Sequence, residues 1–212
     1  MEGRTRRKVV LGLAGMGLSA GIAWPLAFFQ RKNSHSDEGA RVLEVGRLRE
    51  GDILFVIGTS FISSVIRASQ GPFAYTHAGL LVSGKGRLVV IDSDYDPDLN
   101  RDGVSLQDVR DFARKVDRVL VLSNPAFLPE QRRLISQAAL KLQGKKFDLA
   151  LKPDADRLYC TELIARALMA LPDSPITLEP DRFLTPALLY DSLLANGWRE
   201  EILTNRLYVP VF

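Results

Sequence analysis

The chain has 212 residues, of which 46% are hydrophobic and 25% are charged. This composition is typical of a globular protein with one substantial core, and it excludes a disordered chain and a fibrous repeat. A single cysteine excludes a disulfide framework and a multi-cysteine metal site, and two histidines leave little for a histidine-built zinc site. We therefore expect no metal centre and no cofactor.

The excess of basic charge lies at the N-terminus. The chain has 28 basic and 25 acidic residues, and its first eight positions hold four of the bases (Arg4, Arg6, Arg7 and Lys8) and one acid, Glu2. Without these five residues the chain has 24 basic residues (28 minus 4) and 24 acidic residues (25 minus 1). A neutral remainder predicts no general phosphate-binding surface, so nucleic acid is not an expected partner.

An uncharged apolar segment follows this basic cluster. Residues 9–29 form a run of 21 residues without charge, which is long enough to cross about 30 Å of hydrocarbon as a helix. Residues 5–10, Thr-Arg-Arg-Lys-Val-Val, resemble a twin-arginine export signal. Because a basic flank orients a membrane segment and serves no core, we interpret residues 1–30 as a signal or anchor and residues 31–49 as a polar tether. The remainder is then expected on the periplasmic or extracytoplasmic side, whether the anchor is cleaved or retained.

Residues 50–212 predict one folded domain. Its expected strands are short apolar runs, at residues 53–57, 78–82, 88–91, 119–122 and 206–211. Its expected helices have apolar residues at helical spacing with Ser, Thr or Pro near the start, at residues 60–69, 129–143, 160–171 and 185–196. Strands and helices come in separate runs, which favours an α+β fold over an alternating α/β fold.

The only thiol, Cys160, is expected at the start of one of these helices. Backbone N–H groups are unpaired there and the helix dipole is positive, so a thiolate is favoured, as a nucleophile requires. The alternative is that Cys160 is a small buried apolar side chain.

A histidine and a carboxylate are expected to pair across a hairpin. Residues 83–86, Ser-Gly-Lys-Gly, predict a tight turn. With Gly84 and Lys85 at its centre, His77 and Asp92 are directly opposed, and opposed Cβ atoms lie about 5 Å apart. The carboxylate would fix the imidazole tautomer and stabilise its charged form. Together with Cys160 this pair predicts thiol-based acyl transfer, against the alternative of a purely structural histidine.

These residues resemble the circularly permuted papain-like hydrolases related to NlpC-type cell-wall peptidases, in the YiiX-like branch. The resemblance is carried by five segments, residues 51–55, 75–79, 89–92, 144–148 and 159–163. As in the permuted branch, the cysteine helix follows the histidine strand. The resemblance implies a small antiparallel sheet packed against helices that include the nucleophile helix. It also implies that Cys160 is the nucleophile, His77 the general base and acid, and Asp92 the orienting carboxylate.

Two positions depart from the pattern of that branch. The third catalytic position often holds Glu, and Asp92 is one methylene shorter, so the strand pairing must be closer. Phe147 stands where relatives often have Tyr, which removes a phenolic donor to the oxyanion. The backbone N–H of Cys160 can still serve as a donor.

Three other signals are attributed to chance or to solvated structure. Residues 17–21 match the Gly-x-Ser-x-Gly pattern of serine hydrolases, but they lie inside the apolar segment with no strand before them. Residues 98–103 match the first half of a calcium loop, but Val109 stands where the bidentate acid is required, so we expect an acidic solvated loop. His35 lies in the tether and is expected to be inert.

The leading hypothesis is an exported or membrane-anchored cysteine hydrolase that cleaves an amide bond through a thioester, with peptidoglycan peptides as the substrate implied by the family resemblance and the compartment. The second hypothesis is a lipid-directed thiol acyltransferase or deacylase, since permuted relatives include acyltransferases and a membrane anchor holds the site near lipid. The third is a catalytically silent papain-like module that binds wall or lipid fragments.

Overall fold

The computed structural model describes residues 45–58, 61–70, 75–84, 86–97, 99–114, 119–153, 156–180 and 182–204. All of them belong to the unit formed by residues 39–212. The predicted signal or anchor, most of the tether and the predicted strand at residues 206–211 lie outside the described residues. Among the helices that are described, none has the length and apolar character that crossing a bilayer requires.

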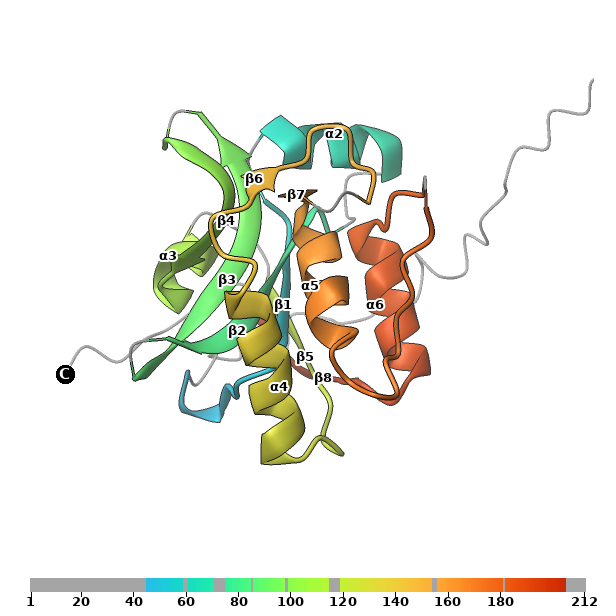
Figure 1. Ribbon diagram of the computed structural model, residues 1–212. Helices are drawn as coiled ribbons and strands as arrows, with labels where there is room; N and C mark the ends of the chain where they lie inside the picture. Colours follow the sequence, from blue (N-terminus) through green and yellow to red (C-terminus); the bar gives the residue numbers. More distant parts are fainter. Residues whose placement is uncertain are drawn as a thin grey trace, which may run out of the picture. The chain divides into compact units, whose positions relative to one another are not determined.

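A six-stranded antiparallel sheet forms the centre of this unit, with strand order β4-β3-β2-β1-β5-β8 (Figure 1). Its strands are β1 (Ile53–Val56), β2 (His77–Gly84), β3 (Arg87–Asp96), β4 (Arg101–Gln107), β5 (Val119–Ser123) and β8 (Arg199–Thr204). A second, two-stranded parallel sheet is formed by β6 (Lys146–Phe147) and β7 (Arg157–Leu158). The predicted α+β class with an antiparallel sheet is confirmed.

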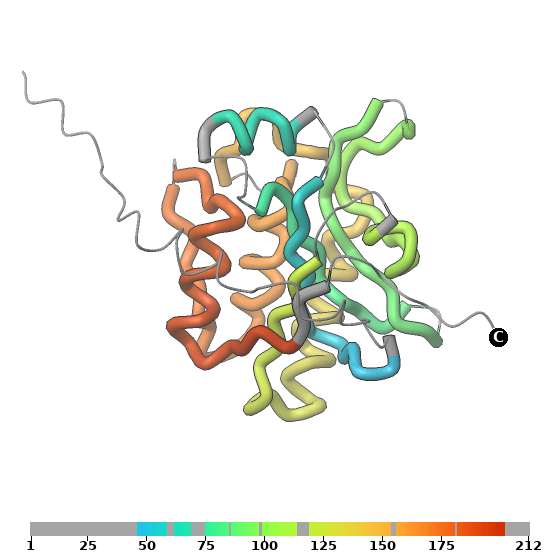
Figure 2. The backbone as a smooth tube through the Cα atoms, turned by 180° about the vertical axis from the view of Figure 1, so that it is seen from behind, coloured from blue at the N-terminus to red at the C-terminus, as the bar shows by residue number. Residues whose placement is uncertain are grey.

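Helices pack on both faces of the sheet. One face carries α4 (Pro129–Leu140), α5 (Cys160–Leu168) and α6 (Pro186–Ala195), and the other carries α3 (Val109–Arg114). Figure 2, seen from behind, shows α3 separated from α5 and α6 by the strands. The remaining helix, α2 (Phe61–Gln70), lies across one end of the strands, and a short 3-10 helix, Val45–Arg47, precedes β1.

The central position of β1 explains its sequence. Ile53 and Phe55 belong to the core under α4, α5 and α6, whereas Leu54 and Val56 belong to the core under α3. All four side chains are buried. A strand that is covered on both faces has no solvent side, so its sequence is a continuous apolar run instead of an alternation.

The predicted register of the β2–β3 hairpin is wrong by two residues. Gly84 pairs with Arg87 and Leu80 with Ile91, so two residues join the strands and the turn centre lies one position later than expected. His77 is therefore not directly opposite Asp92. A shift by two keeps every side chain on its predicted face, because strand side chains alternate with period two. Asp92 is left as a diagonal neighbour, which is still within side-chain reach.

The sequence did not predict β4, although this strand positions the segment that leads to Cys160. The backbone N–H of Val104 donates to the Lys145 carbonyl at 2.8 Å, and that of Gly144 donates to the Val104 carbonyl at 2.9 Å. The approach is close at Gly103, where a Cβ atom would lie 2.0 Å from the Lys145 oxygen. A glycine is therefore required at this point, and a glycine inside a strand weakens the pattern by which strands are predicted.

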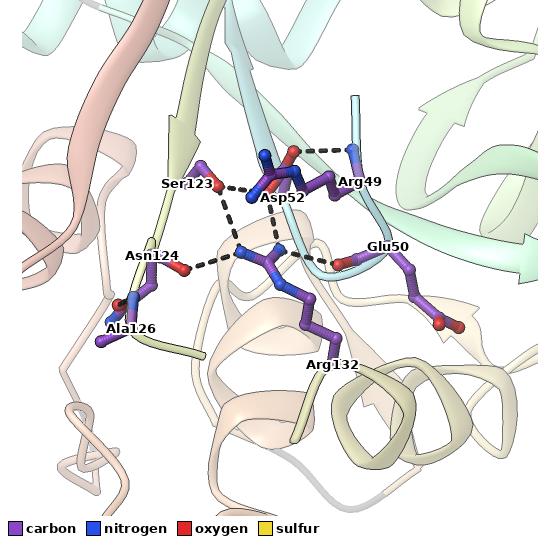
Figure 3. A network of polar contacts seen from close by, with 7 residues as sticks. All are labelled: Arg49, Glu50, Asp52, Ser123, Asn124, Ala126 and Arg132. Carbon is purple, nitrogen blue, oxygen red and sulfur yellow. Dashed lines mark hydrogen bonds and ion pairs between the residues drawn. The ribbon is translucent and has the colours of Figure 1, made fainter. Parts of the chain in front are cut away.

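A buried ion pair joins β1, β5 and α4 (Figure 3). Asp52 Oδ1 accepts from Arg132 Nη1 at 2.9 Å and from the Ser123 hydroxyl at 2.6 Å. Arg132 also donates to the carbonyls of Glu50 and Asn124, at 2.9 and 2.6 Å. The Gly-Asp dipeptide before β1 thus serves the fold, because its carboxylate anchors three elements at the end of the sheet remote from α2.

Candidate active site

Cys160 is the first residue of α5. Tyr159 before it is extended, with φ −98° and ψ 168°, and the first helical hydrogen bond runs from the Leu163 N–H to the Tyr159 carbonyl at 3.0 Å. The N–H groups of Cys160 and Thr161 precede that bond at the positive end of the helix dipole. The thiol is free and only 6% exposed. The predicted start of this helix is confirmed, and it places the sulfur at the positive end of the helix dipole.

His77 is the first residue of β2, and its imidazole is held on two sides. Its Nε2 lies 2.9 Å from Asp92 Oδ2, so the predicted contact forms despite the different register. The Phe112 ring of α3 packs against the imidazole with 5.6 Å between ring centroids. Because Asp92 occupies Nε2, Nδ1 is the nitrogen that is left for a reaction partner.

Asp92 is a buried carboxylate whose charge is directed at the imidazole. Its side chain is 1% exposed, and its Oδ1 has no hydrogen-bond partner among the described residues. A carboxylate that is removed from water needs a compensating charge. The positively charged form of His77 supplies that compensation.

The pKa of His77 is well above its usual value. Burial of the imidazole lowers this pKa, but the charge of the Cys160 thiolate and hydrogen bonding to Asp92 and Cys160 raise it more. The carboxylate of Asp94 raises it further. The site therefore favours the imidazolium form of His77 next to the Cys160 sulfur, and a cationic histidine beside a thiol is the pairing that thiol nucleophiles use.

Cys160 and His77 line the same cleft. Asp94 and the rings of Phe147, Tyr159 and Phe183 also line it. The sulfur therefore does not point into packed hydrocarbon away from the imidazole, which would have contradicted the prediction of a reactive thiol.

Ser93 is a residue of the site that sequence reasoning missed. It follows Asp92 on β3, its side chain is fully buried, and its hydroxyl donates to the Leu158 carbonyl at 2.6 Å. Leu158 lies two residues before Cys160. The bond thus connects the strand that carries Asp92 with the start of the nucleophile helix. An isolated serine in a strand gives no signal of this role, because its partner is 65 residues away.

Phe147 lies in the wall of the cleft, where the family resemblance places a Tyr in many relatives. Its backbone N–H is engaged by Asp102 Oδ1 at 3.2 Å. It therefore offers neither a phenolic donor nor an N–H to a developing oxyanion. The N–H groups at the start of α5 remain as the donors nearest to the sulfur.

Tyr159 and the segment after α5 form another wall. The Tyr159 oxygen accepts from the Leu184 N–H at 3.2 Å, and the Thr161 hydroxyl donates to the Leu184 carbonyl. Burial raises the pKa of Tyr159 to about 12, opposed by the hydrogen bond from Leu184 and supported by the charges of Glu162 and Cys160. The phenol is therefore neutral at physiological pH, and it fixes the segment at Leu184 beside the thiol.

Asp102, from the segment whose sequence matches the first half of a calcium loop, has a structural role. Asp102 forms an ion pair with Lys146 at 3.0 Å, and hydrogen bonding to Lys146 and to the Phe147 N–H lowers its pKa. Asp98 lies outside the described residues. No three His, Cys, Asp or Glu side chains of the described ranges are grouped to hold a metal ion. Asp102 instead connects β4 to β6 and thereby positions Phe147.

Comparison with known proteins agrees with this geometry. A family model described as permuted papain-like amidase enzyme, YaeF/YiiX, C92 family, matches residues 47–191, which is more than half of the chain. Among solved structures, metalloprotein yiiX from Escherichia coli O157:H7 is 24% identical with a TM-score of 0.51, over 69% of this chain and 81% of that one, and shows the shared fold. No curated protein matches. The chain belongs to the C92 family of permuted papain-like amidases, as the resemblance of its motifs predicted.

Proposed function

We propose that this protein is a cysteine amidase in which Cys160, His77 and Asp92 act as a catalytic triad. The observation that carries the proposal is that the only thiol shares one cleft with an imidazole whose Nε2 is bound by a buried carboxylate at 2.9 Å. Three side chains that are distant in the sequence supply nucleophile, base and orienting group, which are the parts required for acyl transfer to sulfur.

The reaction follows from these positions. The Cys160 thiolate attacks the amide carbonyl carbon, and the N–H groups at the start of α5 stabilise the oxyanion. His77 then donates its proton to the nitrogen of the leaving amine, the C–N bond breaks, and a thioester remains on Cys160. Water attacks the thioester while His77 accepts its proton. The carboxylic acid is released and the thiolate–imidazolium pair is restored.

Peptidoglycan peptides are the proposed substrate and the extracytoplasmic side of the membrane is the proposed location. The substrate is supported by the resemblance of the motifs to cell-wall peptidases. The location is supported by the basic N-terminus and the uncharged run at residues 9–29. An acyl-lipid substrate is the alternative that the same membrane attachment favours.

The full chain and its Cys160→Ala, His77→Ala and Asp92→Ala variants test the triad. Each is incubated with muropeptides and, separately, with acyl-ester lipids, and products are followed by mass spectrometry. We expect muropeptide cleavage that is abolished in Cys160→Ala, strongly reduced in His77→Ala, and less reduced in Asp92→Ala because the base itself remains. Equal turnover by all four proteins would refute the mechanism, and turnover of lipid alone would refute the substrate.

A further inference from the structure

Asp94 is a carboxylate of the cleft that the proposed triad does not use. It lies on β3 two residues after Asp92, so both side chains are on the same face of the strand. It lines the cleft together with Cys160 and His77 and is partly exposed. The antiparallel strands β2 and β3 pair Leu80 with Ile91. Continuing this register by three residues on each strand places Asp94 directly opposite His77.

Asp94 differs from the carboxylates of Asp92 and Asp102 in its hydrogen-bond and ion-pair partners. Asp92 is bound to His77 and Asp102 to Lys146. Asp94 accepts one hydrogen bond, from the N–H of the adjacent Tyr95 at 2.9 Å, and no lysine or arginine of the described ranges forms an ion pair with it. Because His77 is already bound to Asp92, Asp94 is not required to orient the base.

The surroundings of Asp94 strengthen its attraction for a cation. Among the described residues that line the cleft, the ionisable ones besides Asp94 are His77, Cys160 and Tyr159. Most of the described wall is apolar and is formed by Ile62, Ile66, Phe147, Leu151 and Phe183. A carboxylate between apolar walls acts through a lower effective dielectric than one on an open surface. A positively charged group that enters the cleft is therefore attracted to the Asp94 carboxylate, beside the thiol.

We propose that Asp94 binds a primary ammonium group of the substrate, so that the protein selects amide substrates that carry a free amine within one or two residues of the scissile bond. The proposal rests on the proposed amidase function and adds the substrate class. We commit to an amine-bearing peptide over an amine-bearing lipid. The reason is that the proposed reaction cleaves an amide bond, and a peptide supplies that bond next to the residue that carries the amine.

The preference of the cleft for positive charge is measured as the rate at which Cys160 reacts with charged and neutral thiol reagents. Cys160 is the only thiol of the chain, so labelling reports on this site alone. The full-length protein is labelled with cationic 2-aminoethyl and neutral 2-hydroxyethyl methanethiosulfonate, and each rate is normalised to that of 2-mercaptoethanol. The ratio of the two rates cancels any change in the thiolate fraction. We expect Asp94→Asn to lower the ratio by about fivefold, the effect of one unit charge near 4 Å in water, and Asp94→Lys to lower it further.

Asp96→Asn is the matched control. Asp96 lies on the same face of β3 two residues further on and does not line the cleft, so its ratio should equal that of the wild type. An unchanged ratio in Asp94→Asn, or an equal fall in Asp96→Asn, would overturn the proposal. This labelling needs no turnover, so it separates failure of the amine site from failure of the amidase function.

The substrate class is tested by protection of Cys160 from the neutral reagent. A stem tripeptide with free amines should protect the wild type at concentrations at least fivefold lower than the same peptide with its amines acetylated. The difference should vanish in Asp94→Asn. Equal protection by the free and acetylated peptides would overturn the proposal, as would stronger protection by phosphatidylethanolamine vesicles than by the tripeptide.

Discussion

Opposing electrostatic effects act on the pKa of His77. Burial favours its neutral form, whereas Cys160, Asp92 and Asp94 all favour the charged form, and the net result is a raised pKa. A group whose pKa is raised by folding stabilises the folded state below its unfolded pKa of about 6.5. That contribution is lost as the pH rises through the folded-state pKa. The same titration removes the imidazolium on which the ionic form of the site depends.

Replacement of Asp92 by Asn should therefore change the pH dependence as well as the rate. The substitution keeps the shape of the side chain but removes the charge that supports the imidazolium, so the pKa of His77 falls. We expect kcat/KM to decrease by about a hundredfold and its alkaline limb to move to lower pH. The pH profile of turnover measures both. Asp96→Asn is the control, and an alkaline limb in the same place as in the wild type would contradict this account.

Phe147 offers a way to test how the oxyanion is stabilised. Since it lines the cleft and has no donor of its own, Phe147→Tyr adds a phenolic hydroxyl where the family resemblance expects one. We expect kcat to rise by about tenfold with little change in KM, which is less than the ~10²–10³ of an optimally placed donor. Phe183→Tyr, on another wall of the same cleft, should leave kcat unchanged. Equal effects of the two substitutions would show that the position has no special relation to the oxyanion.

At the scale of elements, the site depends on how a strand of the sheet meets the start of α5. Ser93 makes this connection through the Leu158 carbonyl. We expect Ser93→Ala to lower the free energy of unfolding by about 1 kcal/mol, the usual value of a hydrogen bond. We also expect it to lower kcat several-fold with KM nearly constant, because Cys160 is held less well relative to His77.

Two further measurements separate positioning from stability. Ser93→Thr keeps the hydroxyl and should recover most of kcat. Leu134→Ala, on the exposed side of α4, is a stability control that should leave kcat unchanged. A Ser93→Ala variant that loses stability but retains the wild-type kcat would show that the bond has only a structural role.

For the whole molecule, the buried ion pair of Asp52 and Arg132 concerns stability, since neither residue lines the cleft of Cys160 and His77. Asp52 and Arg132 are 2% and 7% exposed, and together they join β1, β5 and α4. We expect Arg132→Met to cost about 3–5 kcal/mol of unfolding free energy, because it leaves the Asp52 carboxylate buried without its partner. Denaturant unfolding followed by circular dichroism measures this loss.

Arg133→Met is the matched control, since Arg133 is the next residue on α4 and its side chain is 60% exposed. Its exposed pair with Glu130 should contribute less than about 1 kcal/mol. Adding Asp52→Asn to Arg132→Met should destabilise the protein by less than the sum of the two single changes, because the second change removes the stranded charge. Additive losses would show that the two residues act independently.

The elements of this protein could be predicted from local sequence where one physical rule decides them. The apolar run at β1, the Pro and Thr at the start of α6, and the helix start at Cys160 are local signals, and the structure has an element at each. Local signals failed at β4, where Gly103 and charged residues interrupt the pattern. They also failed at the hairpin register, because a shift of two residues leaves the burial of every side chain unchanged.

By itself the sequence determined the chemistry that is available: one thiol at a helix start, one histidine at a strand start, and carboxylates on the next strand. Only the tertiary structure decided that Asp92 binds His77 while Asp94 lines the cleft without an ion pair to any described lysine or arginine. It also decided that Ser93 connects β3 to the start of α5. The physical reason is that period and propensity act over a few neighbouring residues, whereas these distances depend on how the sheet and α5 pack across more than 60 residues of chain.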